Sequence, residues 1–167
     1  MTRSTPAIFI ALALGLSACA SNQSPPAAYS RLHPVIVDGL DIGAMNAVFI
    51  HGYGEIKSRA IDDPDIDTLF AAALDGFTKI DPDLNISVKA GRVKVAIGDH
   101  VPLDAGPAPH DNIVAWSKSM IMAILVARKI SPELHPVDEE TLYQAAFMGT
   151  LNKIDPYSKY SSRFDAS

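Results

Sequence analysis

The chain has 167 residues, of which 48% are hydrophobic and 20% are charged, and its formal net charge is −5. This length allows one domain, or a domain with a tail, and a core of useful size. Binding to nucleic-acid phosphates needs clustered Lys and Arg, so this acidic balance argues against nucleic acid as a partner. Cys19 is the only cysteine, which excludes a disulfide within the chain and a metal site of paired thiolates.

The N-terminal residues have the features of a targeting segment. Arg3 supplies a short positive region, and residues 6–16 form an apolar stretch too short to span a bilayer. Leu16-Ser-Ala-Cys19 resembles the lipobox of bacterial lipoproteins, in which the cysteine becomes the lipid-modified first residue. The resemblance implies that residues 1–18 are a signal peptide and that Cys19 anchors the chain to a membrane, in the cell envelope and facing the periplasm. An ordinary secretory signal with a chance cysteine is the alternative.

Residues 19–36 are expected to form a flexible tether, because residues 20–34 are mostly Ser, Asn, Gln, Pro and Ala. Such a composition buries too little apolar surface to offset the entropy of ordering. The remaining residues, 37–167, are then one helical domain. A first helix is predicted by apolar residues that share one face, with Gly52 and Gly54 weakening it in the middle; these apolar residues are Met45, Val48, Phe49, Tyr53 and Ile56.

An internal repeat organises the rest of the domain. Asp67–Pro82 and Glu140–Pro156 share the order acid-Thr-Leu-aromatic, then Ala-Ala, Gly and Ile-Asp-Pro, with a slip of one residue. Both copies have apolar residues at helical spacing, and Asp-Pro is expected to end each helix. The repeat predicts two similar helix-link-helix units. Of their side chains we expect the following to be buried: Leu69, Phe77, Trp116, Phe147 and Leu151.

A small β structure is predicted between the two units. Apolar residues alternate with polar or small ones on both sides of a turn at Lys89–Arg92, which is typical of a hairpin. Residues 101–103 are expected to add a short edge, so the insert covers about residues 85–104. Asp111 is the expected N-cap of a long helix that reaches about Lys129. The predicted fold class is therefore mainly α with a small β-hairpin.

The second copy of the repeat carries a resemblance to a known family. Phe147–Tyr160 resembles the segment that closes the N-terminal helical region of the carboxyl-terminal processing (tail-specific) serine proteases, just before their PDZ domain and protease core. The matching motif residues, with Ile154 where the family usually has Leu, are Gly149, Leu151, Ile154, Asp155, Pro156, Tyr157, Ser158 and Tyr160. The resemblance implies that the catalytic Ser and Lys belong to the downstream core, which is expected to be absent here.

Other candidate catalytic or metal-binding residues in this chain have weak support from the sequence. Ser117-Lys118-Ser119 fits a polar helical face, and Ser158 does not match the nucleophile of the family. The histidines lack the i, i+4 spacing of a helical metal site. The acidic residues at 62–67 lack the ligand pattern of a calcium loop, with its central Gly and terminal Glu. No catalytic residue, metal site or cofactor is predicted.

Three interpretations of function remain. The first is a non-catalytic domain that positions or oligomerises at the cell envelope, with a second copy or another protein as its partner. The second is a fragment of a complete C-terminal processing serine peptidase. The third is an unrelated periplasmic helical binding lipoprotein.

Overall fold

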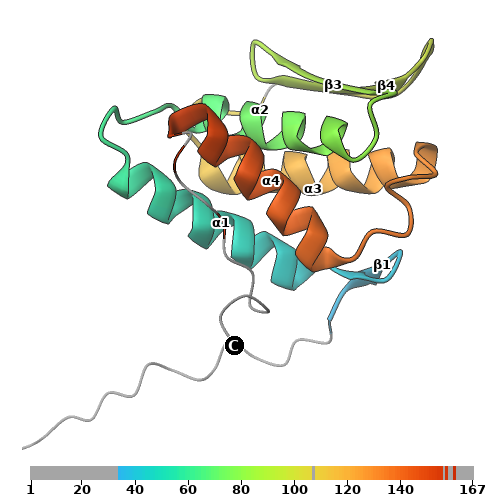
Figure 1. Ribbon diagram of the computed structural model, residues 1–167, viewed down its shortest axis with the longest axis horizontal. Coiled ribbons are helices and arrows are strands. Elements are labelled where there is room, and N and C mark those ends of the chain that lie inside the picture. Colours follow the sequence, from blue (N-terminus) through green and yellow to red (C-terminus); the bar gives the residue numbers. More distant parts are fainter. Residues whose placement is uncertain (1–33, 107, 156, 158–159, 161–167) are drawn as a thin grey trace, which may run out of the picture. The chain divides into compact units, whose positions relative to one another are not determined.

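A computed structural model describes residues 34–106, 108–155, 157 and 160, which fold into four helices and two antiparallel sheets (Figure 1). The mainly helical fold with a small β insert is confirmed. The helices are α1 (Ile42–Arg59), α2 (Ile66–Gly76), α3 (Ile113–Ile130) and α4 (Glu139–Ile154), with a 3₁₀ turn at Phe77–Lys79. The strands are β1 (Ile36–Val37), β2 (Leu40–Asp41), β3 (Leu84–Lys89), β4 (Arg92–Ile97) and β5 (His100–Ala105).

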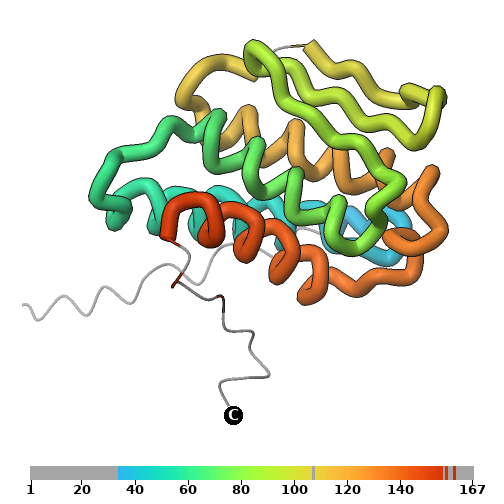
Figure 2. The backbone as a smooth tube through the Cα atoms, turned by 45° about the horizontal axis from the view of Figure 1, so that its top comes forward, coloured from blue at the N-terminus to red at the C-terminus, as the bar shows by residue number. Residues whose placement is uncertain are grey.

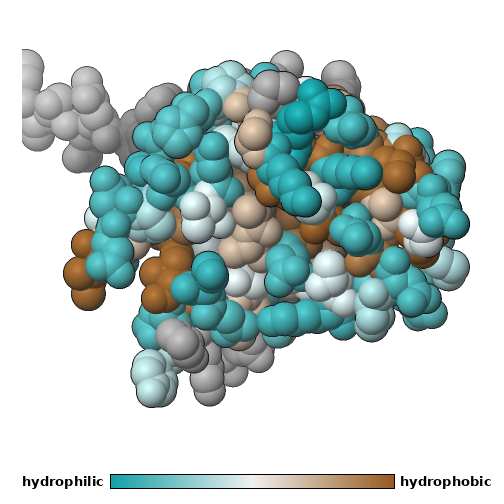
Figure 3. Space-filling view, turned by 90° about the horizontal axis from the view of Figure 1, so that it is seen from above, coloured by the Kyte–Doolittle hydropathy of each residue, from teal (hydrophilic) through white to brown (hydrophobic). Residues whose placement is uncertain are grey.

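The helices pair across the two units of the repeat. α1 packs on α3 and α2 packs on α4, while the three-stranded sheet lies along α2 and α3, away from α1 (Figures 1 and 2). Hydrophilic side chains cover much of the face on which the sheet lies, with smaller apolar areas between them (Figure 3). One apolar core lies inside, and its largest fully buried side chains are Trp116, Tyr53, Phe49, Phe70 and Phe77.

The predicted hairpin is present and has a third strand. Ala90 and Gly91 both have positive φ angles, 49° and 73°, as the two central residues of a type I′ turn require. The order is β3-β4-β5, so β5 is an edge strand and is longer than the expected residues 101–103. Pro102 lies within β5, and an edge strand tolerates proline because one side needs no N–H donor.

The repeat is visible in the helix boundaries and caps. α1 and α3 each have 18 residues, and each begins after a side chain that accepts from a backbone amide three residues later. Asp41 caps α1 by accepting from the amide of Ala44, and Asn112 caps α3 by accepting from that of Ala115. The sequence predicted Asp111 as the N-cap of α3, and this prediction was wrong. It has a positive φ of 54°, and its amide donates to Asp67 instead.

The one-residue slip in the repeat has a structural explanation. After Gly76 the first copy continues as a 3₁₀ turn, whereas the second copy remains α-helical to Ile154. A 3₁₀ helix uses fewer residues per turn, so the shorter copy completes the same turn with one residue less. Both copies then end alike. The carboxylates of Asp81 and Asp155 each accept, at 2.9 Å, from the amide two residues later.

Candidate functional site

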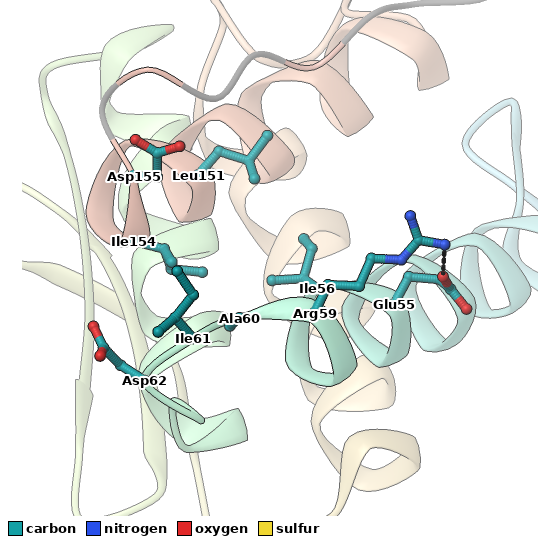
Figure 4. A pocket seen from close by; sticks show the side chains of 9 residues that line it. All are labelled: Glu55, Ile56, Arg59, Ala60, Ile61, Asp62, Leu151, Ile154 and Asp155. Atoms are coloured by element: carbon teal, nitrogen blue, oxygen red, sulfur yellow. Dashed lines mark ion pairs between the residues drawn. The ribbon is translucent and has the colours of Figure 1, made fainter.

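An open groove lies between the end of α1 and the end of α4. Its volume is about 610 Å³. Figure 4 shows its two walls, one from the last turn of α1 with the link that follows and one from the last turn of α4. The lining residues are Glu55, Ile56, Arg59, Ala60, Ile61, Asp62, Leu151, Ile154 and Asp155. Aliphatic side chains thus lie beside three carboxylates and one guanidinium, which give the lining a net charge of −2.

Local structure explains why the groove stays open. α1 ends at Ala60, whose amide still donates to the Ile56 carbonyl but whose backbone is already extended. The next residue, Ile61, is 100% exposed. Across the groove Leu151 is only half-buried, so its expected place in the core is wrong. The core face of α4 is formed by other residues, namely Leu142, Tyr143, Ala146, Phe147 and Thr150.

A smaller hollow of about 370 Å³ adjoins the groove. It shares Ile56 and Leu151 with the groove, and Tyr160 lines it from the segment after α4. The Tyr160 ring stacks on Phe147 with ring centroids 5.4 Å apart. Its hydroxyl donates to Glu140 Oε1 at 3.0 Å. Tyr160 therefore lies along α4, against Phe147 and Glu140, and lines the hollow next to the groove.

The residues of the motif that resembles the protease family segment do not all lie at the groove. Gly149 faces α2 rather than the groove. Leu151, Ile154 and Asp155 line the groove, and Tyr160 lines the adjoining hollow. Tyr157 is 92% exposed. Pro156, Ser158 and the lipobox residue Cys19 lie outside the described residues.

The other half of the molecule has a closed counterpart of this groove. Ser131 follows α3 as Ala60 follows α1, and Asp81 ends its copy of the repeat as Asp155 ends the other. The Ser131 hydroxyl donates to Asp81 Oδ2 at 2.5 Å and accepts from the amide of Leu134 at 2.9 Å. The Leu134 side chain is 0% exposed. The link that contains Ala60, residues 60–65, is shorter than residues 131–138 and has no such leucine, so the groove remains open.

A positively charged side chain near the end of α3, and another near the end of α1, hold the link that follows each helix. Arg128 is buried and donates from Nη1 to the carbonyls of Leu134, at 3.3 Å, and Val137. Its counterpart in α1 is Lys57, whose ammonium donates to the Pro64 carbonyl at 3.4 Å and pairs with Asp63 and Asp111 at 3.3 and 3.2 Å. The hydrogen bond with Asp111 is the main cause of the raised pKa of Lys57. These bonds fix the link beside the groove.

Ser117 has a structural role and does not lie on the polar helical face that the sequence predicted. Ser117 is fully buried, and its hydroxyl donates to Asn46 Oδ1 at 2.8 Å, which joins α3 to α1. Among the residues that the structure describes, no three His, Cys, Asp or Glu side chains lie close enough to hold a metal ion.

Asp67 forms a second polar cluster, at the start of α3. Its carboxylate accepts from Trp116 Nε1 at 2.8 Å and pairs with His110 Nδ1 at 3.1 Å. Burial raises the pKa of Asp67, but the hydrogen bonds from His110, the Asp111 amide and Trp116 outweigh it and lower the pKa. The hydrogen bond with Asp67 raises the pKa of His110. This cluster joins the first turn of α2 to α3, and we assign it a structural role.

Over the described part of the chain, no helix combines the length and apolar character that crossing a bilayer requires. The chain matches no protein-family model, no curated protein and no solved structure in the three comparisons.

Proposed function

We propose that the chain is a non-catalytic, lipid-anchored module of the bacterial cell envelope that positions or oligomerises with a protein partner. The groove between α1 and α4 carries this proposal. Its volume of about 610 Å³ lies in the range of pockets that bind small molecules or side-chain segments. Aliphatic side chains beside charged ones suit a short peptide segment, because the aliphatic surface gains from burying apolar side chains and the charged groups fix their orientation.

The composition of the groove favours binding over chemistry. Acyl transfer needs an activated nucleophile, a base within reach and donors aimed at the oxyanion. The lining residues are aliphatic or charged, and they contain no hydroxyl, thiol or imidazole. The buried Ser117 hydroxyl is engaged with Asn46. These observations support a docking role for this edge of the molecule.

The family resemblance gives independent support. Leu151, Ile154 and Asp155 belong to the motif that resembles the protease segment, and they also line the groove. In that family the segment precedes further domains, so an apolar edge at this point suits contact with another folded unit. The groove is then proposed to serve as a docking edge of the kind that this segment would provide in such a protein.

Membrane fractionation tests the anchor. We expect the full-length chain, expressed in a bacterium that processes lipoproteins, to sediment with membranes. Cys19→Ala should release it into the soluble fraction, whereas Ser21→Ala, two residues away, should not. A Cys19→Ala chain that stays with membranes after alkaline washing would refute the anchor.

A cleavage assay tests the non-catalytic assignment. The full-length Cys19→Ala chain is incubated with an unfolded protein that has an apolar C-terminus, beside a Ser117→Ala/Ser158→Ala double variant. We expect no cleavage by either. Cleavage by the parent that disappears in the double variant would show peptidase activity and overturn the assignment.

A further inference from the structure

We propose that a cleft between α1 and α3 is a docking surface for a phospholipid bilayer with anionic headgroups, so that the anchored domain lies on the membrane through this face. The cleft has a volume of about 430 Å³ and shares no lining residue with the groove between α1 and α4. Its lining residues are Val35, Ile42, Gly43, Asn46, Lys118, Ile121, Met122 and Leu125. The inference rests on the proposed membrane location of the chain and adds which face of the domain meets the membrane.

Large apolar side chains are exposed at this cleft. Val35 and Met122, which line it from different elements, are 61% and 52% exposed. Ile36, next to Val35 in the chain, is 55% exposed. Apolar side chains gain free energy when they leave water, and exposed groups of them are typical of surfaces that contact a protein or a membrane.

α3 has the charge pattern of a helix that lies on a membrane surface. Val114, Lys118 and Met122 are spaced by four residues and are all exposed, so they lie along one side of the helix. Lys129, in the last turn, is exposed as well. α3 contains no Asp or Glu, whereas α1, α2 and α4 each contain at least one. Apolar residues with lysines and without acids suit the headgroup region of an anionic bilayer.

Hydrogen bonds fix the start of the domain beside the cleft. The Val35 carbonyl accepts from the amide of Ile42, at the first turn of α1, at 3.0 Å. The amide of Asp41 donates to Glu139 Oε1 on α4. The hairpin of β1 and β2 is thus tied to two helices, and the point where the chain enters the domain lies at the edge of the cleft.

The proposed anchor brings the cleft to the bilayer. Val35 is 16 residues after Cys19, a length of chain that spans roughly 55 Å when fully extended. A surface tethered so closely meets the membrane at a high effective concentration, so a weak intrinsic affinity is enough. Residues 20–34 contain Arg31 and no Asp or Glu, so this segment adds no charge that an anionic surface would repel.

Charge disfavours a second copy of the chain as the occupant. In a symmetric contact the same face of both copies meets, which would bring Lys118 and Lys129 of one copy near the same lysines of the other. Like charges at an interface oppose binding, whereas anionic headgroups attract both lysines. The lining also contains no acidic side chain that a basic peptide would need.

Footprinting of lysine amines tests the proposal. The full-length chain is coupled through Cys19, its only cysteine, to a maleimide lipid in vesicles of phosphatidylglycerol and phosphatidylethanolamine. A water-soluble acylating reagent then modifies the lysines, and mass spectrometry follows each rate. We expect Lys118 to react at least about fivefold more slowly than in the uncoupled chain without vesicles. The internal control is Lys94, which is exposed between the buried Val93 and Val95 of β4 and should change by less than about twofold.

Two substitutions make the test specific. Met122→Asp places a negative charge on the docking face and should return the rate of Lys118 to that of the uncoupled chain. Val101→Asp is the matched control, because Val101 is 42% exposed on the edge strand β5, and it should leave the slow rate unchanged. Circular dichroism should be the same for both variants and the parent, because both positions are exposed.

Three results would overturn the proposal. One is an equal rate for Lys118 in the coupled and uncoupled chains, and another is equal slowing of Lys118 and Lys94. The third is slowing of Lys118 in the uncoupled chain that increases with protein concentration, which would identify a second copy as the occupant. The coupling supplies the anchor chemically, so a failure here is distinguishable from a failure of the membrane-fractionation test.

Discussion

Gly76 and Gly149, which correspond in the two copies of the repeat, lie against each other where α2 packs on α4. A Cβ added to Gly149 would lie 3.0 Å from the Gly76 Cα and closer still to the carbonyl oxygen of Ala72. A Cβ added to Gly76 would lie 2.9 Å from the carbonyl carbon of Ala145. Ala72 and Ala145 also correspond, so each glycine packs on the alanine of the other copy. Only glycine permits this approach of two backbones.

Alanine at either glycine should therefore destabilise the fold. We expect Gly76→Ala and Gly149→Ala each to lower the free energy of unfolding by about 2–3 kcal/mol, as overpacking of a tight contact does. Gly54→Ala is the control, because its Cβ would meet only the Ile113 Cδ1 at 3.9 Å. There alanine should stabilise α1 by about 0.5–1 kcal/mol through its helix propensity. Urea unfolding measures all three, and equal effects at positions 54 and 76 would disprove the close contact.

Leu134 in the closed site and Leu151 in the open groove should contribute differently to the free energy of unfolding. Leu134→Ala should cost about 2–5 kcal/mol, because it leaves a cavity around a fully buried side chain. Leu151→Ala should cost about 1 kcal/mol or less, because its half-buried side chain loses a smaller apolar contact. The comparison uses thermal and urea unfolding of both variants. A larger cost for Leu151 than for Leu134 would contradict the assignment of the groove as open.

The hydroxyl of Ser131 should contribute strongly to the stability of the fold, although it is a small group. Ser131→Ala removes the donor to the buried Asp81 and the acceptor for the Leu134 amide. We expect a loss of about 1–3 kcal/mol, since unsatisfied buried polar groups are costly. Ser58→Ala serves as the control, because this exposed serine bonds only to a carbonyl in its own helix, and its effect should stay within about 0.5 kcal/mol. A similar small effect at Ser131 would rule out a role for its hydrogen bonds in closing the site.

The pair of His110 and Asp67 should make stability depend on pH. The pKa of His110 is raised in the folded chain, so its contribution is complete below the ordinary value of about 6.5 and is lost as pH rises through the folded value. The pKa of Asp67 is lowered, so its contribution is present above about pH 3.9 and is lost as pH falls through the folded value. Titration of His110 by NMR should show a pKa that drops in Asp67→Asn. An unchanged pKa would mean that the two side chains are not paired in solution.

Much of the helical fold could be predicted because both copies of the repeat have local sequence patterns that are typical of helices. Apolar spacing located α2 and α4, and Asp-Pro marked the end of α4. The prediction that Asp-Pro also ends α2 was wrong, because α2 ends at Gly76 and a 3₁₀ turn follows. The alternation of residues 86–97 located the hairpin. The small hairpin of β1 and β2 was missed, although Asp38-Gly39 is a typical signal for a two-residue turn. Its strands were too short to stand out against the expected tether.

The groove could not be predicted, because it depends on a difference between the two halves in three dimensions. Leu151 has helical spacing and looks like a core residue, but no link residue covers it. Ile61 looks like one apolar residue in a polar link, and only the buried Leu134 in the other half shows what is missing there. The N-cap of α3 was placed one residue early for a similar reason. Asp111 and Asn112 are both good caps, and contacts with Lys57 and Asp67 decide between them.

The exchange of helix partners between the two units governs how the chain can fold. Ser117 meets Asn46 across 71 residues of sequence, and Thr150 meets Tyr53 across 97. Helical proteins usually fold through local contacts, whereas here the core closes only when distant segments meet. Neither half can bury its apolar faces alone, so a nascent chain that lacks α4 still has an open core. Of the four described helices α4 is synthesised last, so its arrival is the step that commits the four-helix core to its folded state.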